Sequence, residues 1–280
     1  MRKDSTARTL IVAACMCVVC SVIVCTASVF LKPIQDVQRE ADKKRNVLMA
    51  AGVDQWQGKQ LGQLSPDEVI KAFDDEIESR WLHVETGEFV DEKDVPPECL
   101  DEVKAAKSPD EKLSTKLAED SARIGRRAHY RQVYLKKTDG RIERLILPIH
   151  GKGLWSTLYG FIALDGDMTG TITIKSLAFY QHGETPGLGG EVDNPRWKVL
   201  WVDKKAFDES ARGTDKEWVP VIEVIKGAVA QDDPRRDYKV NGLSGATLTA
   251  NGVRDLVKFW LGQEGYGPLL RELKRGGDHG

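Results

Sequence analysis

Three glycine-rich segments contain the side chains that are best suited to bind a ligand. They are residues 150–156 (HGKGLWS), 182–191 (HGETPGLGGE) and 241–249 (NGLSGATLT). Each could be only a turn between strands. The large apolar side chains beside the glycines, Leu154, Trp155 and Leu188, favour a different use. A flat ring needs apolar walls and closely approaching backbone, and glycine allows that approach.

The third segment leads into a predicted helix. The residues that follow it, 251–262, have apolar side chains on one helical face, namely Val253, Leu256, Val257 and Trp260. Ser244, Thr247 and Thr249 therefore lie just before or at a helix N-terminus, where free N–H groups and the helix dipole favour an anion. A phosphate is the natural candidate. The alternative is a helix cap with spare hydroxyl groups.

Other kinds of chemistry have little support in the sequence. It holds no G-x-S-x-G, Walker A or H-E-x-x-H motif and no dinucleotide-binding fingerprint after a strand. Without that fingerprint we expect no NADH site in this chain. No two of the five histidines have helical ligand spacing, so we expect no metal site either. Lys and Arg number 41 against 43 Asp and Glu, a net charge of −2 that argues against a nucleic-acid partner.

The elements that must position these segments follow from shorter patterns. Short β-rich runs are broken by Gly, Asp and Pro at 130–136, 140–151, 159–165, 170–182, 196–203 and 217–227. Helices are expected at 34–50 and at 65–82, the second with Ser65 as its cap and Pro66 at its first position. The charged residues 91–128 are expected to form loop and exposed helix in a peripheral layer. Together the patterns predict an α+β fold, an antiparallel sheet covered by helices.

An uncharged apolar segment lies near the N-terminus. Residues 9–31 hold 23 residues without a charge, enough for a helix to cross a hydrocarbon core of about 30 Å. A cleaved signal peptide is the alternative, although its apolar region spans only about 7–15 residues. Basic residues stand on both sides of the segment. Because a large domain is translocated regardless of charge, we expect the N-terminus inside and the bulk outside.

The three segments together resemble the FMN-binding domain family. The matching motifs are GKGLWSTLYGFIAL, HGETPGLGGE and NGLSGATLTANGV, in this order. With the single anchor before them and FWLGQEGYGPLL after them, the whole chain resembles the NqrC family, which supplies one subunit of the Na⁺-translocating NADH:quinone reductases. The resemblance implies a flavoprotein subunit of the bacterial inner membrane with its bulk on the periplasmic side. It also implies partner subunits that pass electrons from NADH to ubiquinone and export Na⁺.

The resemblance further implies a covalent cofactor. In the family pattern FMN is joined by a phosphoester to the threonine that closes S-G-A-T, which is Thr247 here, and a separate flavin transferase makes the bond. Thr249 is the alternative acceptor. The transferase motif usually begins with Asp, where this chain has Asn241. The phosphate is expected to meet donors from the same segment, namely Ser244, Gly245, Ala246 and Leu248.

Around the flavin ring, the resemblance places residues of the first two segments. Leu154 and Trp155 are expected to form a wall, and the second segment is expected to contribute Glu184, Thr185, Gly187, Leu188 and Gly189. Glu184 would hydrogen-bond the ribityl chain or the ring edge, and the alternative is that it is only a carboxylate in a turn. Lys198 or Lys226 is expected to offset the charge of a reduced, anionic flavin. The chain is then divided into a cytoplasmic N-terminus with a transmembrane anchor (1–32), a membrane-proximal helical and loop region (33–128) and the FMN-binding domain (129–280).

Three other functions remain open from the sequence. The RnfG family of the Rnf electron-transport complexes shares the anchor and the S-G-A-T motif, but the long 65–128 insertion and the C-terminal motif favour the NqrC family. A non-redox, membrane-tethered binding protein would use the glycines only as turns and would be colourless when purified. A hydrolase has the least support, because the sequence shows no pattern that pairs a nucleophile with a base.

Overall fold

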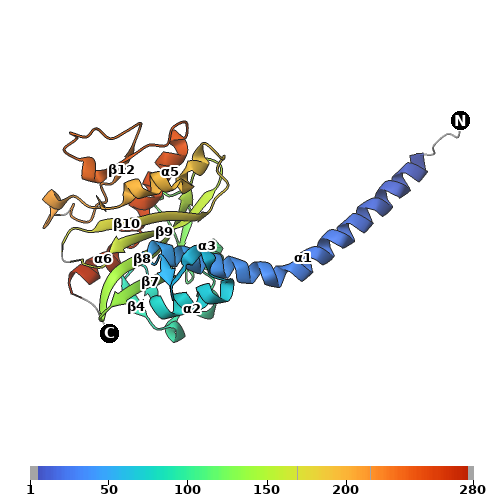
Figure 1. The fold of residues 1–280 in the computed structure, drawn as a ribbon, viewed down its shortest axis with the longest axis horizontal. Helices are drawn as coiled ribbons and strands as arrows, with labels where there is room; N and C mark the ends of the chain where they lie inside the picture. The colour runs from blue at the N-terminus through green and yellow to red at the C-terminus, as the bar shows by residue number, and fades with distance from the viewer. Residues whose placement is uncertain (1–5, 169, 215, 277–280) are drawn as a thin grey trace.

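A seven-stranded sheet forms the centre of the structure, a computed structural model that describes residues 6–168, 170–214 and 216–276 (Figure 1). Its strand order is β11-β10-β9-β8-β7-β3-β4. Four long strands form an antiparallel meander, namely β7 (Tyr130–Thr138), β8 (Arg141–Lys152), β9 (Thr157–Asp165) and β10 (Thr173–Gln181). They confirm the β structure expected over 130–182.

Shorter strands extend this sheet and form three small ones. β3 (Glu78–His83) and β4 (Glu88–Val90) continue it at one edge, and β11 (Lys204–Lys205) ends it at the other. The antiparallel two-stranded sheets are β1 (Gln55–Trp56) with β2 (Lys59–Gln60) and β5 (Ser114–Lys116) with β6 (Arg126–Ala128). A parallel pair is formed by β12 (Glu223–Ile225) and β13 (Lys239–Asn241).

Helices cover both faces of the main sheet, which confirms the α+β class. α1 (Thr6–Ala50) and α2 (Pro66–Glu76) share one hydrophobic cluster with Tyr134, Ile146 and Phe161 of the strands. Adjacent strand residues such as Val133 and Leu145 point to the other face, because side chains alternate along a strand. There they pack in the larger cluster that includes residues of α5 (Thr247–Leu261) and α6 (Gly267–Lys274).

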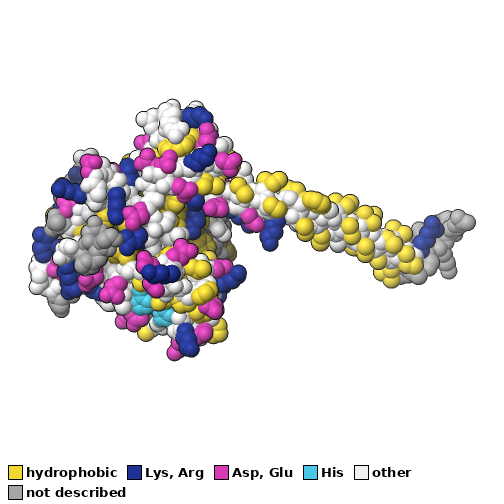
Figure 2. All heavy atoms as spheres, turned by 90° about the horizontal axis from the view of Figure 1, so that it is seen from below, with side chains coloured by type: hydrophobic (Ala, Val, Ile, Leu, Met, Phe, Trp, Pro, Cys, Tyr) yellow, Lys and Arg dark blue, Asp and Glu magenta, His cyan; other side chains and the backbone are white. Residues whose placement is uncertain are grey.

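The helix α1 joins the apolar N-terminal segment to the core without a break. Its residues 8–40 are exposed, whereas Val47 and Leu48 are buried against α2 and the sheet. Within the described residues it is the one helix long and apolar enough to cross a membrane. Figure 2 shows its free length as a projecting arm with a mostly apolar surface. The helix expected at 34–50 is confirmed, and it continues through Pro33 into the apolar segment.

The helix expected at 65–82 is correct only in its first part. Ser65 caps the helix as expected and forms a capping box with Glu68, but α2 ends at Glu76 and Ile77 is already extended. Residues Glu78–His83 instead form β3, because six residue pairs with β7 satisfy their backbone groups in the sheet. Pairing within the sheet thus outweighs the local helical pattern.

Two of the expected strands differ from the structure. The short β-rich run of residues 196–203 predicts a strand, but Asn194 caps a helical turn with Pro195 at its first position, so that α4 (Pro195–Lys198) and a 3₁₀ turn (Val199–Trp201) replace it. Residues 217–227 contribute only the short strand β12. Capping geometry and proline outweigh the β-rich composition in the first case.

The region between 91 and 128 contains more structure than loop and exposed helix. It holds α3 (Glu102–Lys107), β5 and β6, with a small hydrophobic cluster around Cys99 and Trp81. β3, from before residue 128, pairs with β7 after it. The division at residue 128 remains a prediction, and the main sheet draws strands from both sides of it. Residues 1–5 and 277–280 of the outer predicted domains lie outside the described residues.

Candidate functional site

The three glycine-rich segments meet at one end of the main sheet. The first segment forms the turn between β8 and β9, and the second follows the end of β10, where Gln181 pairs with Tyr159 near the start of β9. Contacts at the glycines show how closely they approach. A Cβ atom added to Gly153 would lie 2.6 Å from Oε1 of Glu184, and one added to Gly189 would lie 2.6 Å from Oγ1 of Thr249. Glycine is therefore required at both positions.

A single carboxylate ties the three segments together. Glu184 is only 4% exposed. Its Oε1 accepts hydrogen bonds from the amides of Trp155 and Ser156, both at 3.0 Å, and from the Ser156 hydroxyl at 3.0 Å. Its Oε2 accepts from the amide of Leu154 at 3.2 Å and from the hydroxyl of Thr249 at 2.6 Å. Five donors from two other segments thus surround one buried anion.

These hydrogen bonds also set the charge state of Glu184. Burial by itself raises the pKa of the carboxyl, because it disfavours the charged form. The hydrogen bonds from Thr249 and from the amides of Ser156, Trp155 and Leu154 act in the opposite direction. They outweigh burial, so that the pKa lies below its ordinary value and the carboxylate is ionised at neutral pH. The predicted contact of Glu184 with the flavin stays a prediction, and the structure gives its carboxylate five protein donors.

The two threonines of the third segment have different surroundings. Thr249 is 1% exposed and uses its hydroxyl on Glu184. Thr247 is exposed, and its side chain has no hydrogen bond among the described residues. It is the first residue of α5, which begins a few residues earlier than the expected helical stretch. The free hydroxyl therefore belongs to Thr247 and not to Thr249.

The N-terminus of α5 offers donors to an anion. No side chain caps this helix among the described residues, and Ala246 occupies the cap position. The first amides of a helix have no acceptor within it, so those of Thr247 and Leu248 are available. Ser244 is exposed just before the helix, and Gly245 has a φ of +72°, which favours glycine. The arrangement fits a phosphate group at or beside Thr247.

Exposed apolar side chains occur in all three segments, two of them at or beside this helix start. Among the residues of the three segments, four large ones face solvent: Leu154 (46% exposed), Trp155 (73%), Leu188 (46%) and Leu248 (59%). A Cβ atom on Gly245 would lie 3.0 Å from Cδ2 of Leu188, so the second and third segments touch at this point. Side chains of this kind are suited to line an aromatic ring.

The turn that presents Leu188 is fixed by its own backbone. The carbonyl oxygen of Thr185 accepts hydrogen bonds from the amides of Leu188 at 3.1 Å and Gly190 at 2.9 Å. Gly187 has a φ of +74°, a conformation that side chains with a Cβ rarely adopt. Thr185 and Gly187 are both exposed, whereas Gly189 is buried beside Glu184. Of the residues predicted from the second segment, Glu184 and Gly189 thus lie inside and the others lie at the surface.

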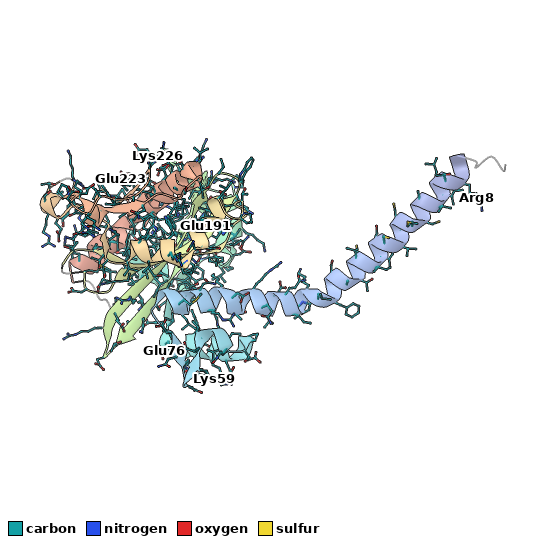
Figure 3. All side chains as sticks on the ribbon, turned by 45° about the horizontal axis from the view of Figure 1, so that its top comes forward. Arg8, Lys59, Glu76, Glu191, Glu223 and Lys226 are labelled. Carbon is teal, nitrogen blue, oxygen red and sulfur yellow. The ribbon has the colours of Figure 1, made fainter. Side chains whose placement is uncertain are left out.

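The two lysines predicted to offset flavin charge have different positions. Nζ of Lys198 lies 3.3 Å from Oδ1 of Asp193, and the other oxygen of Asp193 lies 2.8 Å from Nε2 of His182. Lys198 is therefore linked to the second segment through Asp193. Lys226 is exposed at the molecular surface and is labelled near the top of Figure 3.

Asn241, which stands where the family pattern has Asp, supports the neighbouring loop. Its side-chain oxygen accepts a hydrogen bond from the amide of Val229 at 2.8 Å, and its carbonyl oxygen accepts one from Nε1 of Trp197 at 2.9 Å. Aspartate could accept the same bond from Val229. The structure therefore gives Asn241 a local structural part that does not depend on the motif.

Sequence reasoning missed three residues of this site. Ser156 binds Glu184 through both its amide and its hydroxyl, and the hydroxyl oxygen accepts from the amide of Gly183 at 2.8 Å. Asp193 joins His182 to Lys198. Thr249 acts as a partner of Glu184, whereas the sequence suggested it only as an alternative acceptor. The sequence could have indicated Ser156 as a site residue, because it follows Trp155 directly in the first motif.

Comparisons with known proteins agree with this geometry. The sequence pattern of the FMN-binding domain family matches residues 153–262. This range contains the second and third segments in full and the first segment from residue 153. The chain is 46% identical to the NqrC subunit of the Na(+)-translocating NADH-quinone reductase of Pseudomonas aeruginosa, over 98% of both chains. It is 41% identical to the same subunit of Yersinia pestis, over 98% of this chain and 95% of the other.

Solved structures show the same likeness. The crystal structure of Shewanella oneidensis NqrC is similar with a TM-score of 0.69 and 32% sequence identity, covering 85% of this chain and 99% of that one. The crystal structure of the same subunit from Parabacteroides distasonis is similar with a TM-score of 0.56 and 26% identity, covering 89% of this chain and 98% of that one. The likeness thus includes the fold as well as the sequence.

Proposed function

The chain belongs to the NqrC family of the Na(+)-translocating NADH-quinone reductases, and we propose that it relays electrons in such a complex through an FMN bound covalently to Thr247. The family makes it one subunit of an oxidoreductase complex, with an FMN-binding domain. One observation supports the attachment site above all. Thr247 is an exposed, unpartnered hydroxyl at an uncapped helix start within the described residues, with the exposed Leu248 next to it and the exposed Leu188 against Gly245.

The protein side of the bond-forming step follows from these surroundings. In the transfer we propose, the Thr247 hydroxyl displaces AMP from FAD on a flavin transferase. A bond from Thr247 Oγ1 to phosphorus forms, the pyrophosphate bond breaks, and the hydroxyl proton leaves to a base or to solvent. The amides at the start of α5 and the Ser244 hydroxyl then hold the phosphate, because both are donors near a positive helix end. Thr249 does not compete, since its hydroxyl is buried against Glu184.

The chain's own residues would then position the ring and limit water around it. FMN supplies the redox chemistry when it is bound. Leu154, Trp155 and Leu188 offer apolar surface, and Glu184 fixes the loop that carries the first two of them. Covalent attachment lets the ring stay at the surface, because affinity need not come from enclosure. A surface ring suits transfer to a neighbouring subunit, and the sequence offers no dinucleotide fingerprint for NADH.

The position in the membrane is also part of the proposal. We place residues 9–31 of α1 across the bacterial inner membrane as a single span, with the FMN-binding domain on the periplasmic side. The exposed apolar length of α1 supports this placement, since such a surface is stable in lipid and not in water. Arg2 and Lys3, which precede the span, lie outside the described residues. Attachment of the flavin is then useful, because it prevents its loss outside the cytoplasm.

The test compares two threonines that differ in exposure. The chain is coexpressed with a flavin transferase as wild type, Thr247→Val and Thr249→Val, and each is run on a denaturing gel and examined for flavin fluorescence. We expect bright bands for the wild type and for Thr249→Val, and a dark band for Thr247→Val. Peptide mass spectrometry then checks the phosphoester mass on the peptide that contains Thr247.

Two results would contradict the proposal in different ways. A bright Thr247→Val band would move the attachment to another residue and keep the flavoprotein. Dark bands for all three proteins, with a known flavinylated protein bright in the same cells, would remove covalent FMN from this chain. In the second case the non-redox binding function becomes the better interpretation.

A further inference from the structure

A second site lies between α3 and the main sheet. It is a cavity of about 630 Å³. Its walls come from α3 and the residues just before it, from the 123–128 segment, from β7, β8, β9 and β10, and from single residues of α1 and β3. His150 and Lys152, at the start of the first glycine-rich segment, line it, whereas Leu154, Trp155 and Thr247 do not. Its volume falls within the range of small-molecule sites, about 300–1,000 Å³. The sequence suggested only a peripheral layer here.

Positive charge is in excess around this cavity. Six cationic side chains line it, namely Lys43, Lys107, Arg123, Arg126, Arg131 and Lys152. Two carboxylates line it as well, and both have partners. Asp101 accepts from the amide of Lys104 at 3.1 Å, and Glu102 accepts from the amide of Gln132 at 2.7 Å. An anion entering the cavity would therefore meet more positive than negative charge, which is favourable in a partly enclosed site.

Arg131 is the buried member of this group. It is 6% exposed, and its guanidinium lies 4.1 Å from the centre of the Trp260 ring. Its Nε forms an ion pair with Oε2 of Glu102 at 3.4 Å. The same nitrogen is buried and makes no hydrogen bond among the described residues. Buried polar groups are usually hydrogen-bonded, so such an exception needs an explanation. A ligand or an ordered water that accepts from this guanidinium would supply one.

His150 does not balance this charge. Burial, with the nearby charge of Arg131, lowers the pKa of His150 to about 3, so that its ring is neutral at physiological pH. Its Nδ1 lies 3.4 Å from a terminal nitrogen of Arg131. The guanidinium and the imidazole thus form one polar end of the cavity, and this end has a net positive charge with donors to offer.

The remaining walls are apolar and partly aromatic. Tyr159 stacks on His150 with ring centres 5.6 Å apart, and Tyr180 also lines the cavity. From the α3 side come Leu100 and Val103, which are 45% and 51% exposed. Large apolar side chains on the inner side of a charged rim are typical of a site for a ligand with an apolar body.

We propose that this cavity binds a small organic anion with a flat apolar body, of the aromatic carboxylate class. The anionic group would accept from Arg131 and the rim cations, since guanidinium groups match carboxylates in geometry. The flat body would lie along Tyr159, Tyr180 and Val103. The ligand comes from solution and not from lipid when α1 is placed as proposed above. Lys43 lies 12 residues after Leu31, about 18 Å along a helix, whereas a headgroup layer is about 5–8 Å thick.

The test is a titration of the full chain in lipid nanodiscs with 2-naphthoate, followed by calorimetry with empty nanodiscs subtracted. The neutral analogue 2-naphthalenemethanol is the control for charge. The variant Val103→Glu adds a negative charge at an exposed cavity position, and Val219→Glu is its matched control. Val219 is also half exposed (52%) but lies outside this cavity. An unchanged melting temperature for each variant shows that it folds.

We expect saturable binding of 2-naphthoate to the wild type. The Kd should rise about tenfold or more in Val103→Glu and stay within about twofold in Val219→Glu. The neutral analogue should bind at least about tenfold more weakly than the anion. The proposal fails if the wild type shows no saturation up to about 1 mM, if Val103→Glu binds like the wild type, or if the neutral analogue binds equally well. Flavin attachment does not enter this test, so its failure would leave the proposed function intact.

Discussion

The glycine-rich site and the α3 cavity lie beside the same strands, yet they use polar groups in opposite ways. In the glycine-rich site the Glu184 carboxylate meets five donors, while the exposed positions carry apolar side chains. In the cavity the cations outnumber the carboxylates, and the buried Arg131 has a nitrogen without a hydrogen bond among the described residues. In the glycine-rich site the polar groups bond to one another and the exposed surface is apolar. In the cavity the lining itself carries net positive charge.

The difference teaches how to separate frame from binding surface in this molecule. A buried polar network whose members are all paired holds the backbone in one shape and offers little to a ligand. A ligand can instead contact groups that lie outside such a network. These are apolar side chains exposed to water, which a ligand can cover, and a buried cation with a free donor, which a ligand can accept from. By this rule Glu184 belongs to the frame, whereas Trp155, Thr247 and Arg131 are the residues that we propose for the binding surfaces.

The largest effect in this comparison is expected from Glu184→Gln, which removes the buried carboxylate of the glycine-rich site. The amide has one oxygen acceptor in place of two and brings an NH₂ group towards other donors, so several hydrogen bonds are lost. We expect the free energy of unfolding to fall by about 2–4 kcal/mol, measured by urea denaturation of the full chain in detergent. Glu76→Gln is the control, because Glu76 is exposed on α2 (Figure 3). Equal stability of the two variants would show that Glu184 is not a structural centre.

The same variant gives a pH test with a defined sign. Since the folded-state pKa of Glu184 is lowered from 4.5, its ionisation stabilises the fold above that value. This stabilisation is lost as the pH falls from 4.5 through the lower folded-state pKa. The stability difference between wild type and Glu184→Gln should therefore be largest at neutral pH and shrink on acidification. A difference that grows as the solution is made more acidic would contradict the assigned charge state.

A middle-sized effect is expected from Gly189→Ala. The new methyl group would lie 2.6 Å from Oγ1 of Thr249 and 2.8 Å from Oε2 of Glu184, so the network must shift. We expect a loss of about 1–3 kcal/mol in the free energy of unfolding. Gly62→Ala is the matched control, since its Cβ would meet nothing within 4 Å and its φ is not positive. Losses of similar size in both variants would point to a general glycine effect.

The smallest effect on stability, with a separate effect on the cofactor, is expected from Trp155→Ala. Because Trp155 is 73% exposed, the free energy of unfolding should change by less than about 0.5 kcal/mol. The absorbance maximum or the midpoint potential of the flavin should nevertheless shift, because an aromatic neighbour of the ring is removed. A destabilised variant with unchanged flavin properties would assign Trp155 to the frame and remove it from the ring site.

The sequence predicted those parts of the site that depend on local patterns. The start of α5 near Thr247, the meander from β7 to β10 and the three motifs could be found because glycine, capping and alternation act over a few residues. The role of Glu184 could not, since its partners lie 28–65 positions away along the chain. Such a carboxylate looks the same in sequence whether it faces solvent, a ligand or five buried donors.

The errors have similar physical causes. β3 was expected as the end of a helix, because its pairing partner β7 is distant in sequence and local helical spacing was the stronger signal. Residues 196–203 are rich in the residue types that favour a strand, but Asn194 and Pro195 begin a helical turn. The cavity was missed because its walls come from segments that are far apart in the sequence. Such a site arises only when packing brings unrelated side chains together.

The unbroken course of α1 has a consequence for how the flavin site meets its partners. The helix is packed into the core from Ala41 onward, so no flexible linker separates the domain from the anchor within the described residues. Pro33 removes one helical hydrogen bond and is the natural point of bending. With the anchor in the membrane as proposed, bending at Pro33 moves the site only within a limited range close to the membrane surface. A partner in the same membrane then meets it at a high effective concentration, so brief contacts suffice and tight binding between the two is not needed.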